Sequence, residues 1–309
     1  MIQPEISIVI PAFNESANLG ILVDRVLSSL QPLGCTCEIL IVNDGSTDST
    51  AQTLADLGRL HPQLRTIHFA RNFGKEAALA AGMEAATGQA VLFMDADLQH
   101  PPELLAQMVN AWRQGAHVVN AIKRRRGAEP LLYRWCAKVF NRSMSASLQF
   151  NMAGASDYKL LDYRVVQALL DCPERVRFFR GMVAWVGFQQ ENIAFDVAAR
   201  HAGQTSWSTG ALLRYTLRNL LAFSSAPLYW VAVTGLAMAV LSFAMFGQTL
   251  YTYFFTGAAV GFTTVISLQV MLGGVVLSAL GIIAAYLALI YEEVKRRPMY
   301  VIKSPDDSR

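Results

Sequence analysis

The sequence predicts an α/β domain with a mostly parallel sheet, followed by a hairpin of two membrane-spanning helices. In the first part of the chain, short and wholly apolar runs alternate with longer amphipathic stretches. Strands buried on both faces have this apolar character, and their alternation with helices is typical of a parallel sheet covered by helices. In the second part, no Asp, Glu, Lys or Arg occurs from Asn219 to Tyr291. Charged residues make up only 16% of the chain, against roughly 25% in an average soluble domain, which indicates a membrane segment.

Five strands and four helices are expected in the first part. The expected strands are Ile6–Ile10, Glu38–Val42, Leu64–Phe69, Ala90–Met94 and Val118–Ile122. The expected helices are Asn18–Leu30, Thr50–Leu60, Lys75–Ala86 and Pro102–Gln114. The first strand has no basic flank ahead of it and is followed at once by Pro11, so we expect a buried strand there rather than a signal peptide. Because ligands of such sheets bind outside the carboxyl ends of the strands, the polar residues after the strands are expected to meet in one cleft.

The second part contains two apolar segments, over about residues 228–250 and 265–291. Each reaches the roughly 20 residues that a helix needs to cross a bilayer. The stretch before them sets leucines against Arg214 and Arg218, which is typical of a helix in the membrane interface. Basic residues also follow the second segment, at Lys295–Arg297, and the connecting loop is uncharged. We therefore expect a hairpin in the cytoplasmic (inner) membrane, with the first domain and both termini in the cytoplasm.

These features divide the chain into four expected parts: a cytoplasmic domain over 1–207, an amphipathic helix over 208–226, a transmembrane hairpin over 227–292 and a cytoplasmic tail over 293–309. The alternative to the hairpin is a pair of buried helices in a large soluble core, which the length of the charge-free stretch disfavours. The net charge of +3 is too small to indicate a nucleic-acid partner. The cysteines show no metal-ligand spacing and are expected to be free, as in a reducing compartment; they are Cys35, Cys37, Cys136 and Cys172.

The fourth strand is followed directly by Asp95-Ala96-Asp97-Leu98-Gln99. Two carboxylates one residue apart can both reach a divalent cation, and Mg²⁺ or Mn²⁺ takes oxygen ligands that are often shared with substrate phosphates. Gln99 offers a third oxygen on the same side if the backbone stays extended. An isolated pair of this kind often caps a turn, so its interpretation depends on the neighbouring loops.

Three other strand ends carry residues of the same polar type, in Pro11–Glu15, Asn43–Asp48 and Arg71–Lys75. The carboxylate and amide groups of the first two loops suit hydrogen bonds to a base or a ribose, and Lys75 suits a phosphate. The alternatives are a turn with a helix N-cap at Ser46 or its neighbour, and a solvated Lys75. Four such loops at one edge of a sheet are what a nucleotide-diphosphate site requires.

The order of these motifs resembles the GT-A glycosyltransferases of family 2. More narrowly, it resembles the polyprenyl-phosphate glycosyltransferases, which comprise the dolichol-phosphate mannose synthase group and bacterial relatives that load glucose or other sugars onto undecaprenyl phosphate. The likeness continues through Asp157–Asp162, Arg180-Gly181 and Arg200–Trp207, and ends with the hairpin, which resembles the bacterial glucosyl branch. The chain departs from the family pattern at Tyr163, where Arg is common, and at Trp207, where Tyr or Lys is common.

The resemblance implies a Rossmann-like GT-A fold and an inverting transfer of a sugar, first of all glucose from UDP-glucose, to undecaprenyl phosphate. It implies a bound Mg²⁺ or Mn²⁺ at Asp95, Asp97 and Gln99. The residues expected to bind the nucleotide sugar are Pro11, Ala12, Asn14, Glu15, Asp44, Lys75, Asp95, Ala96, Asp97 and Arg200. The expected catalytic residues are Asp97 and Asp157.

The acceptor side is expected to be basic, because a polyprenyl phosphate is anionic. The residues expected to meet its phosphate are Lys123, Arg134 and Lys138. The alternative is a polybasic strip attracted to anionic lipid, worth about 1 kcal/mol per basic residue. Since a phosphate monoester has a second pKa of about 6, no strong catalytic base is required. Asp157 is therefore expected either to orient the sugar or the acceptor, or to cap a turn.

Two rival functions stay open at this stage. A processive polysaccharide synthase would share the Asp-x-Asp strand, but it would carry a Gln-x-x-Arg-Trp element and more spans, neither of which this sequence contains. A non-catalytic membrane scaffold would be expected to lose Asp95 or Asp97, and both are present. Assembly of the hairpin into a homo-oligomer is left open by the sequence.

Overall fold

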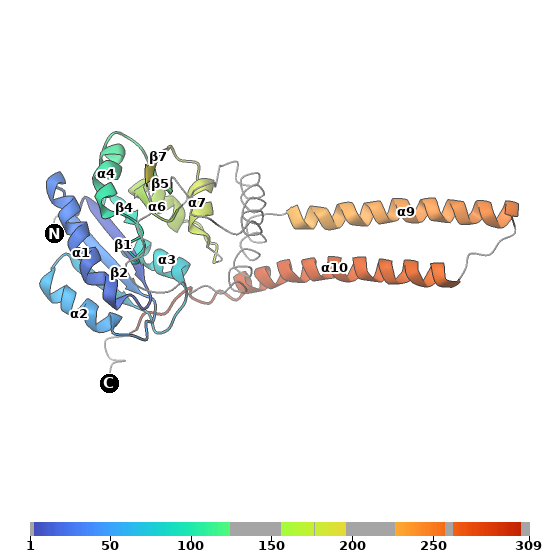
Figure 1. The fold of residues 1–309 in the computed structure, drawn as a ribbon, viewed down its shortest axis with the longest axis horizontal. Helices are drawn as coiled ribbons and strands as arrows, with labels where there is room; N and C mark the ends of the chain where they lie inside the picture. Colours follow the sequence, from blue (N-terminus) through green and yellow to red (C-terminus); the bar gives the residue numbers. More distant parts are fainter. Residues whose placement is uncertain (1–2, 124–155, 176, 196–225, 257–261, 304–309) are drawn as a thin grey trace. The chain divides into compact units, whose positions relative to one another are not determined.

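The computed structural model describes residues 3–123, 156–175, 177–195, 226–256 and 262–303 (Figure 1). The chain divides into two compact units. One comprises Met1–Leu212 together with Arg297–Arg309, and the other comprises Leu213–Arg296. The C-terminal residues therefore group with the first unit. The amphipathic helix expected over 208–226 lies almost wholly outside the described residues.

The first unit contains a seven-stranded sheet of order β3-β2-β1-β4-β6-β5-β7. Its strands are β1 (Ile6–Ala12), β2 (Cys37–Asn43), β3 (Leu64–His68), β4 (Ala90–Phe93), β5 (Val118–Lys123), β6 (Lys159–Asp162) and β7 (Gln190–Phe195). Neighbouring strands are parallel except at β6, which runs antiparallel to β4 and β5. The predicted mostly parallel α/β fold is thus confirmed. Because β1 to β4 are parallel to one another, their carboxyl ends lie at the same edge of the sheet.

The helices of the first unit pack in two groups, one formed by α1, α2 and α4 and the other by α3, α6 and α7. Their bounds are α1 (Ser16–Leu30), α2 (Thr50–Leu60), α3 (Lys75–Ala85), α4 (Leu105–Arg113), α6 (Tyr163–Leu170) and α7 (Phe179–Trp185). The helix predicted from Pro102 begins as a 3₁₀ turn, η2 (Pro102–Leu104). A second 3₁₀ turn, η1 (Gln31–Leu33), follows α1. Each of the five predicted strands is present, and no strand end differs from the prediction by more than two residues.

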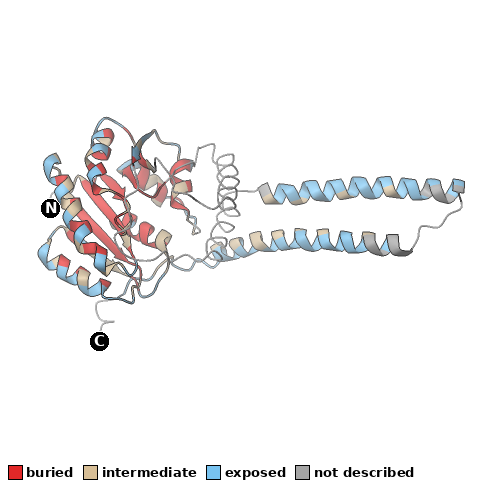
Figure 2. Ribbon diagram, in the orientation of Figure 1, coloured by how far each residue is buried: buried red, intermediate tan, exposed pale blue. Residues whose placement is uncertain are grey.

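The hydrophobic core lies along the central strands, as the buried residues in Figure 2 show. The apolar face predicted for the first helix is the face that α1 buries, with Leu19, Leu22 and Val26 fully enclosed. On the other group of helices, α3 approaches β1 very closely. A Cβ added to Gly82 would lie 2.2 Å from Val9 Cγ1, so only glycine fits at this crossing. This close packing fixes α3, whose first residue is Lys75.

A short segment at the end of the chain extends the edge of the sheet next to β3. Phe69 and Ile302 form an isolated antiparallel bridge. The Ala70 N–H donates to the Val301 carbonyl at 2.9 Å, and the Lys303 N–H donates to the His68 carbonyl at 2.7 Å. The strand predicted over Leu64–Phe69 ends one residue earlier, at His68. Phe69 forms the bridge to the C-terminal segment, while its N–H still donates to the Asn43 carbonyl of β2 at 2.9 Å.

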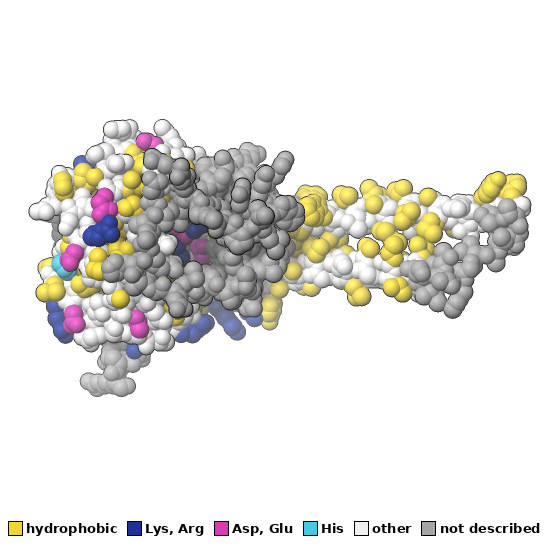
Figure 3. Space-filling view, in the orientation of Figure 1, with side chains coloured by type: hydrophobic (Ala, Val, Ile, Leu, Met, Phe, Trp, Pro, Cys, Tyr) yellow, Lys and Arg dark blue, Asp and Glu magenta, His cyan; other side chains and the backbone are white. Residues whose placement is uncertain are grey.

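The second unit consists of two long helices in its described residues, α9 (Ala226–Thr256) and α10 (Phe262–Val294). The segments Pro227–Thr249 and Leu268–Val294 are long and apolar enough to cross a membrane, judged by length and composition. Their apolar side chains are exposed rather than buried in a core, as in Trp230 and Phe243. Figure 3 shows hydrophobic side chains along both helices, whereas the Asp and Glu side chains in view lie on the first unit. So large an exposed apolar surface marks a site that contacts a membrane or another protein.

Candidate functional site

The loops that follow β1 and β2 are joined by Asn14. Its backbone N–H donates to Ser46 Oγ at 2.9 Å, and its side-chain Oδ1 accepts the Thr47 N–H at 2.8 Å. Asn14 has a φ of 57°, a left-handed conformation that asparagine tolerates better than most residues. Ser46 is not the N-cap predicted as one alternative for this loop, because α2 begins only at Thr50 and its N-cap is Ser49.

Asp44 joins the loop after β2 to the loop after β3. Its carboxylate is buried, and its two oxygens accept the Phe73 N–H at 2.7 Å and the Gly74 N–H at 2.9 Å. Burial raises the pKa of Asp44 above its usual value, against the opposing effect of these two donors. Gly45 lies so close to Arg71 that an added Cβ would be 2.3 Å from its carbonyl carbon. The predicted convergence of these loops is thus present in the structure.

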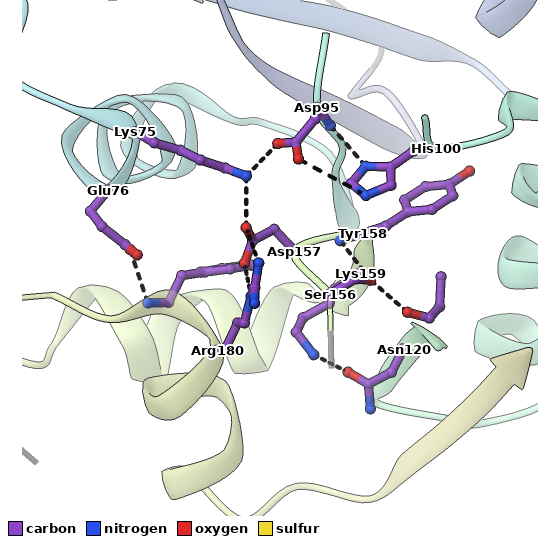
Figure 4. Close-up of polar contacts among 12 residues, drawn as sticks. Lys75, Glu76, Asp95, His100, Asn120, Ser156, Asp157, Tyr158, Lys159 and Arg180 are labelled. Atoms are coloured by element: carbon purple, nitrogen blue, oxygen red, sulfur yellow. Dashed lines mark hydrogen bonds and ion pairs between the residues drawn. The ribbon is translucent and has the colours of Figure 1, made fainter. Parts of the chain in front are cut away.

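Lys75 lies between two carboxylates at the carboxyl edge of the sheet (Figure 4). Its Nζ is 2.5 Å from Asp95 Oδ1 and 2.6 Å from Asp157 Oδ2. Asp95 follows β4, and Asp157 precedes β6. Lys75 was expected either to meet a phosphate or to be solvated, and in this structure it forms two ion pairs.

Arg180 completes this cluster from α7. Its Nε donates to Asp157 Oδ1 at 2.6 Å, and its Nη2 donates to Asp157 Oδ2 at 2.9 Å. A further bond aligns the two helices that supply the cations, since the Phe179 N–H at the start of α7 donates to Glu76 Oε2 on α3 at 2.9 Å. Asp157 is therefore held by two cations on two helices.

The four charged groups stabilise one another's ionised forms. Burial disfavours the charged form of Asp157, but Arg180 and Lys75 offset this and hold the pKa of Asp157 well below its usual range. Burial acts against Asp95 in the same way, and Lys75, through its charge and its hydrogen bond, holds the pKa of Asp95 below its usual value. Both carboxylates are therefore held in their charged forms by neighbouring cations, and the cluster positions these groups by charge.

His100 accepts a hydrogen bond from the backbone of Asp95. The Asp95 N–H donates to His100 Nδ1 at 3.1 Å, so this nitrogen carries no proton in the bonded form. The buried imidazole ring stacks on Tyr158, with centroids 4.9 Å apart and an interplanar angle of 16°. The Tyr158 hydroxyl donates to the Pro101 carbonyl at 3.0 Å. His100 follows Gln99 directly in the sequence, but nothing in the residue pattern shows that its ring turns back to Asp95.

Gln99 was expected to share a side with Asp95 and Asp97 if the backbone stayed extended. The segment after Asp95 is not extended. Leu98 has a φ of 61°, and the Gln99 N–H donates to Asp97 Oδ1 at 3.1 Å, which closes a turn. Asp95, Asp97 and Gln99 are nevertheless partly exposed, whereas Ala96 and Leu98 are buried. The three oxygen-bearing side chains are thus all accessible to solvent, although the backbone forms a turn rather than an extended strand.

The donor set at this turn fits a hard divalent cation. Among the residues that the structure describes, no three His, Cys, Asp or Glu side chains are grouped so as to hold a metal. Mg²⁺ is commonly bound by only one or two carboxylates together with substrate phosphates. Asp95 and Asp97 supply two such carboxylates, and Gln99 adds an amide oxygen. A cation bound there would compete with Lys75 for Asp95.

The other predicted site residues divide into two groups. Pro11 and Ala12 form the end of β1, and Glu15 accepts the Asn18 amide at 2.6 Å while its own N–H donates to Thr50 Oγ1 at 3.0 Å. The predicted basic residues fall largely beyond the part that the structure describes. Lys123 ends β5, but its side chain is outside the described residues, as are Arg134, Lys138 and Arg200 entirely.

The family model for glycosyl transferase family 2 matches residues 7–167, which is more than half of the chain and includes β1 to β6. The chain belongs to this family. An uncharacterized glycosyltransferase of Synechocystis sp. is 40% identical over 300 residues, covering 96% of this chain and 94% of the relative. The bactoprenol glucosyl transferase of Shigella phage SfII is 33% identical over 305 residues, covering 97% of each chain. The predicted resemblance is confirmed.

A prophage bactoprenol glucosyl transferase homolog of Escherichia coli is 32% identical over 305 residues, covering 97% of this chain and 98% of the relative. Among solved structures, the chain is similar to glucosyl-3-phosphoglycerate synthase from Mycobacterium tuberculosis, in a complex with Mn²⁺, UDP and glucosyl-3-phosphoglycerate. That likeness has a TM-score of 0.51 at 21% identity and covers 71% of this chain and 79% of the synthase. At this identity the likeness supports the fold of the family 2 chain and nothing more specific.

Proposed function

We propose that this family 2 chain transfers a sugar from a nucleotide sugar to a polyprenyl phosphate, with glucose from UDP-glucose and undecaprenyl phosphate as the substrates. The observation that carries the proposal is the convergence of Asp44, Lys75 and Asp95 on one edge of a family 2 domain, in a chain that also holds two helices of membrane-crossing length. Relatives named bactoprenol glucosyl transferase align over nearly the whole of this chain, hairpin included.

The donor is proposed to lie along the joined loops after β1, β2 and β4. Pro11, Ala12, Asn14, Glu15 and Asp44 would bind the base and ribose. Asp95 and Asp97, with Gln99, would hold Mg²⁺ or Mn²⁺, which supplies positive charge against the negative charge that builds on the departing nucleoside diphosphate. The proposed diphosphate site also includes Ala96, Lys75 and Arg200.

The acceptor phosphate is proposed to attack the anomeric carbon directly, with inversion of configuration. A phosphate monoester with a second pKa of about 6 is already anionic near neutral pH. It therefore needs no proton acceptor, which suits a cluster whose carboxylates have lowered pKa values. Asp157 would act by holding Lys75 and Arg180 in position rather than by taking a proton. Lys123, Arg134 and Lys138 would meet the acceptor phosphate.

The membrane part would bring the domain to the lipid. An acceptor with a polyprenyl chain resides in the bilayer, and two apolar helices in the same chain would keep the domain at its surface. The basic residues on both outer flanks of the hairpin support an orientation with the domain on the cytoplasmic face.

The direct test uses the purified full-length chain in detergent with radiolabelled UDP-glucose and undecaprenyl phosphate, with Mg²⁺, with Mn²⁺ or with a chelator. We expect labelled glucose to enter the lipid phase in a cation-dependent manner. UDP-N-acetylglucosamine and GDP-mannose in parallel reactions decide the sugar. A long polymeric product would favour a processive synthase, and no turnover with any donor would favour a non-catalytic scaffold.

A further inference from the structure

The segment 299–303, here termed the tail strand, returns to the first unit directly after α10. Only residues 295–298 separate α10 from it. The tail strand pairs with Phe69 and its neighbours through two backbone hydrogen bonds. β3 is the outermost strand of the sheet on this side, so the tail strand covers an edge that would otherwise present unpaired backbone groups. Edge protection alone would explain these backbone contacts.

The side chain of Tyr300 does more than cover an edge. Its ring stacks on Phe69, with centroids 4.8 Å apart and an interplanar angle of 14°. Its hydroxyl donates to Glu84 Oε2 on α3 at 2.5 Å. Burial and the Glu84 carboxylate together raise the pKa of Tyr300, so the hydroxyl keeps the proton that this bond requires. One half-buried side chain therefore connects the residue after β3 to the last turn of α3.

The segment between Phe69 and Glu84 begins with the loop that holds Asp44 and leads into α3 at Lys75. Phe69 meets Phe73 edge-on, with centroids 5.8 Å apart. The N–H groups of Phe73 and Gly74 hold the two oxygens of Asp44. Tyr300, Phe69 and Phe73 belong to one apolar cluster with Val42 and the alanines of α3. The tail strand thus contacts the start of the donor loop, defined here as residues 70–75, and the far end of α3, the helix into which that loop leads.

We propose that Tyr300 is a positioning residue for the nucleotide-sugar donor, acting through Phe69 and Phe73 on Asp44 and through Glu84 on α3. This inference rests on the proposed function, because it takes the Asp44 loop to be the donor site. When the stack and the hydroxyl bond are removed, the donor loop samples more conformations. Donor binding must then order the loop, and that cost appears as weaker affinity.

The test compares Tyr300→Ala with Val301→Ala in the full-length chain. Val301 is in the same tail strand, but its side chain is exposed, and its backbone carbonyl accepts the bond from the Ala70 N–H. The readouts are the Kd for UDP with Mn²⁺ by calorimetry, the KM for donor and for acceptor, and hydrogen exchange of the peptide covering 70–75. We expect Tyr300→Ala to raise the UDP Kd and donor KM by roughly tenfold, equivalent to about 1.4 kcal/mol. The acceptor KM should stay unchanged, amide exchange at 70–75 should accelerate, and Val301→Ala should behave as wild type.

A purely structural role would lower the melting temperature and leave the UDP Kd unchanged well below that temperature, and this result would overturn the inference. Failure of the wild-type chain to bind UDP would instead contradict the proposed function. Should Tyr300→Ala not fold, Tyr300→Phe and Glu84→Gln decide the question, since each weakens only the hydroxyl bond. A twofold to fivefold rise in the UDP Kd, about the effect of one hydrogen bond, supports the inference in both variants, and wild-type affinity with wild-type exchange in both overturns it.

Discussion

Lys75 Nζ lies 2.5 Å from Asp95 Oδ1 and is shared with Asp157 at 2.6 Å. Without a cation between them, these two carboxylates would repel each other in a partly enclosed site. The side chain of Lys75 therefore supplies, from within the chain, a positive charge at the place where Asp95 is proposed to meet a metal ion. We therefore expect Lys75 and the proposed metal ion to compete for Asp95. Their competition can be measured in the absence of any substrate.

Removal of Lys75 should strengthen metal binding while weakening catalysis. In Lys75→Ala we expect the Kd for Mn²⁺ alone, measured by electron paramagnetic resonance, to fall by roughly tenfold, because a unit positive charge a few Å away no longer opposes the ion. Turnover should fall on the order of a hundredfold, the usual effect of losing one group that stabilises developing charge. Arg59→Ala, which removes an exposed cation of α2 paired with Asp56, serves as the control. An unchanged Mn²⁺ Kd in Lys75→Ala would contradict this competition.

Acid should weaken the fold through Asp157, and the direction follows from its pKa. The pKa of Asp157 is lowered in the folded chain, whereas an unfolded Asp has a pKa of about 3.9. The charged form is thus favoured by folding, so its stabilisation is complete above about pH 5 and is lost as the pH falls through 4 and below. We expect Asp157→Asn to melt well below wild type at pH 7. The difference between the two melting temperatures should shrink as the pH is lowered to 3.5.

If the difference in melting temperature between wild type and Asp157→Asn stays constant from pH 7 to pH 3.5, the contribution of Asp157 to stability does not depend on its charge. Asp162→Asn is a suitable comparison, since Asp162 also has a lowered pKa and caps α6, but it accepts from Trp112 and Arg164 away from the cluster. Donor KM should change in Asp157→Asn and not in Asp162→Asn.

His100 should matter through Nδ1, which accepts the Asp95 N–H, whereas its Nε2 lies at a longer 3.9 Å from Asp95 Oδ2. Asn at this position can place an acceptor oxygen near the site of Nδ1, whereas Gln places its oxygen further out and Ala provides none. Leaving a buried N–H without a partner costs about 1–3 kcal/mol. We expect His100→Asn to keep a donor KM and Mn²⁺ Kd within a few-fold of wild type, and His100→Ala and His100→Gln to raise both. Equal effects in all three variants would show that the ring acts by packing on Tyr158 or through its Nε2, and not through Nδ1.

Local sequence patterns predicted the sheet well where strands are continuous apolar runs, as in Ile6–Ile10 and Glu38–Val42. They did not predict β7, whose Gln190–Phe195 sequence is half polar and half exposed, or β6, a four-residue strand that begins with the buried Lys159. Both strands are placed by pairing with β5, which is a long-range relationship that no local period expresses.

The same limit applies to the candidate site. Asp44, Lys75 and Asp95 follow strands directly, so the rule that ligands bind at carboxyl ends of strands located them. The ion pair of Arg180 with Asp157 and the bond of Tyr300 with Glu84 depend on chain paths that bring distant segments together. The residue order supplies no pattern for such contacts, and the turn at Leu98 shows that even a neighbouring residue can leave the extended path assumed for it.

The crossing of α3 over β1 should tolerate no side chain larger than hydrogen at Gly82. A Cβ there would lie 2.2 Å from Val9 Cγ1, and Val9 is a fully buried, β-branched residue of β1, so its methyl group cannot rotate away at low cost. Overpacking of this kind typically costs about 1–3 kcal/mol. We expect Gly82→Ala to lower the melting temperature and, because α3 begins at Lys75, to raise the donor KM.

Gly20→Ala in α1 is the matched control, since nothing lies within 4 Å of its added Cβ, and it should stabilise the chain by up to about 1 kcal/mol. Val9→Ala combined with Gly82→Ala should recover part of both losses, and a double variant no better than Gly82→Ala alone would show that the strain lies elsewhere than at this contact.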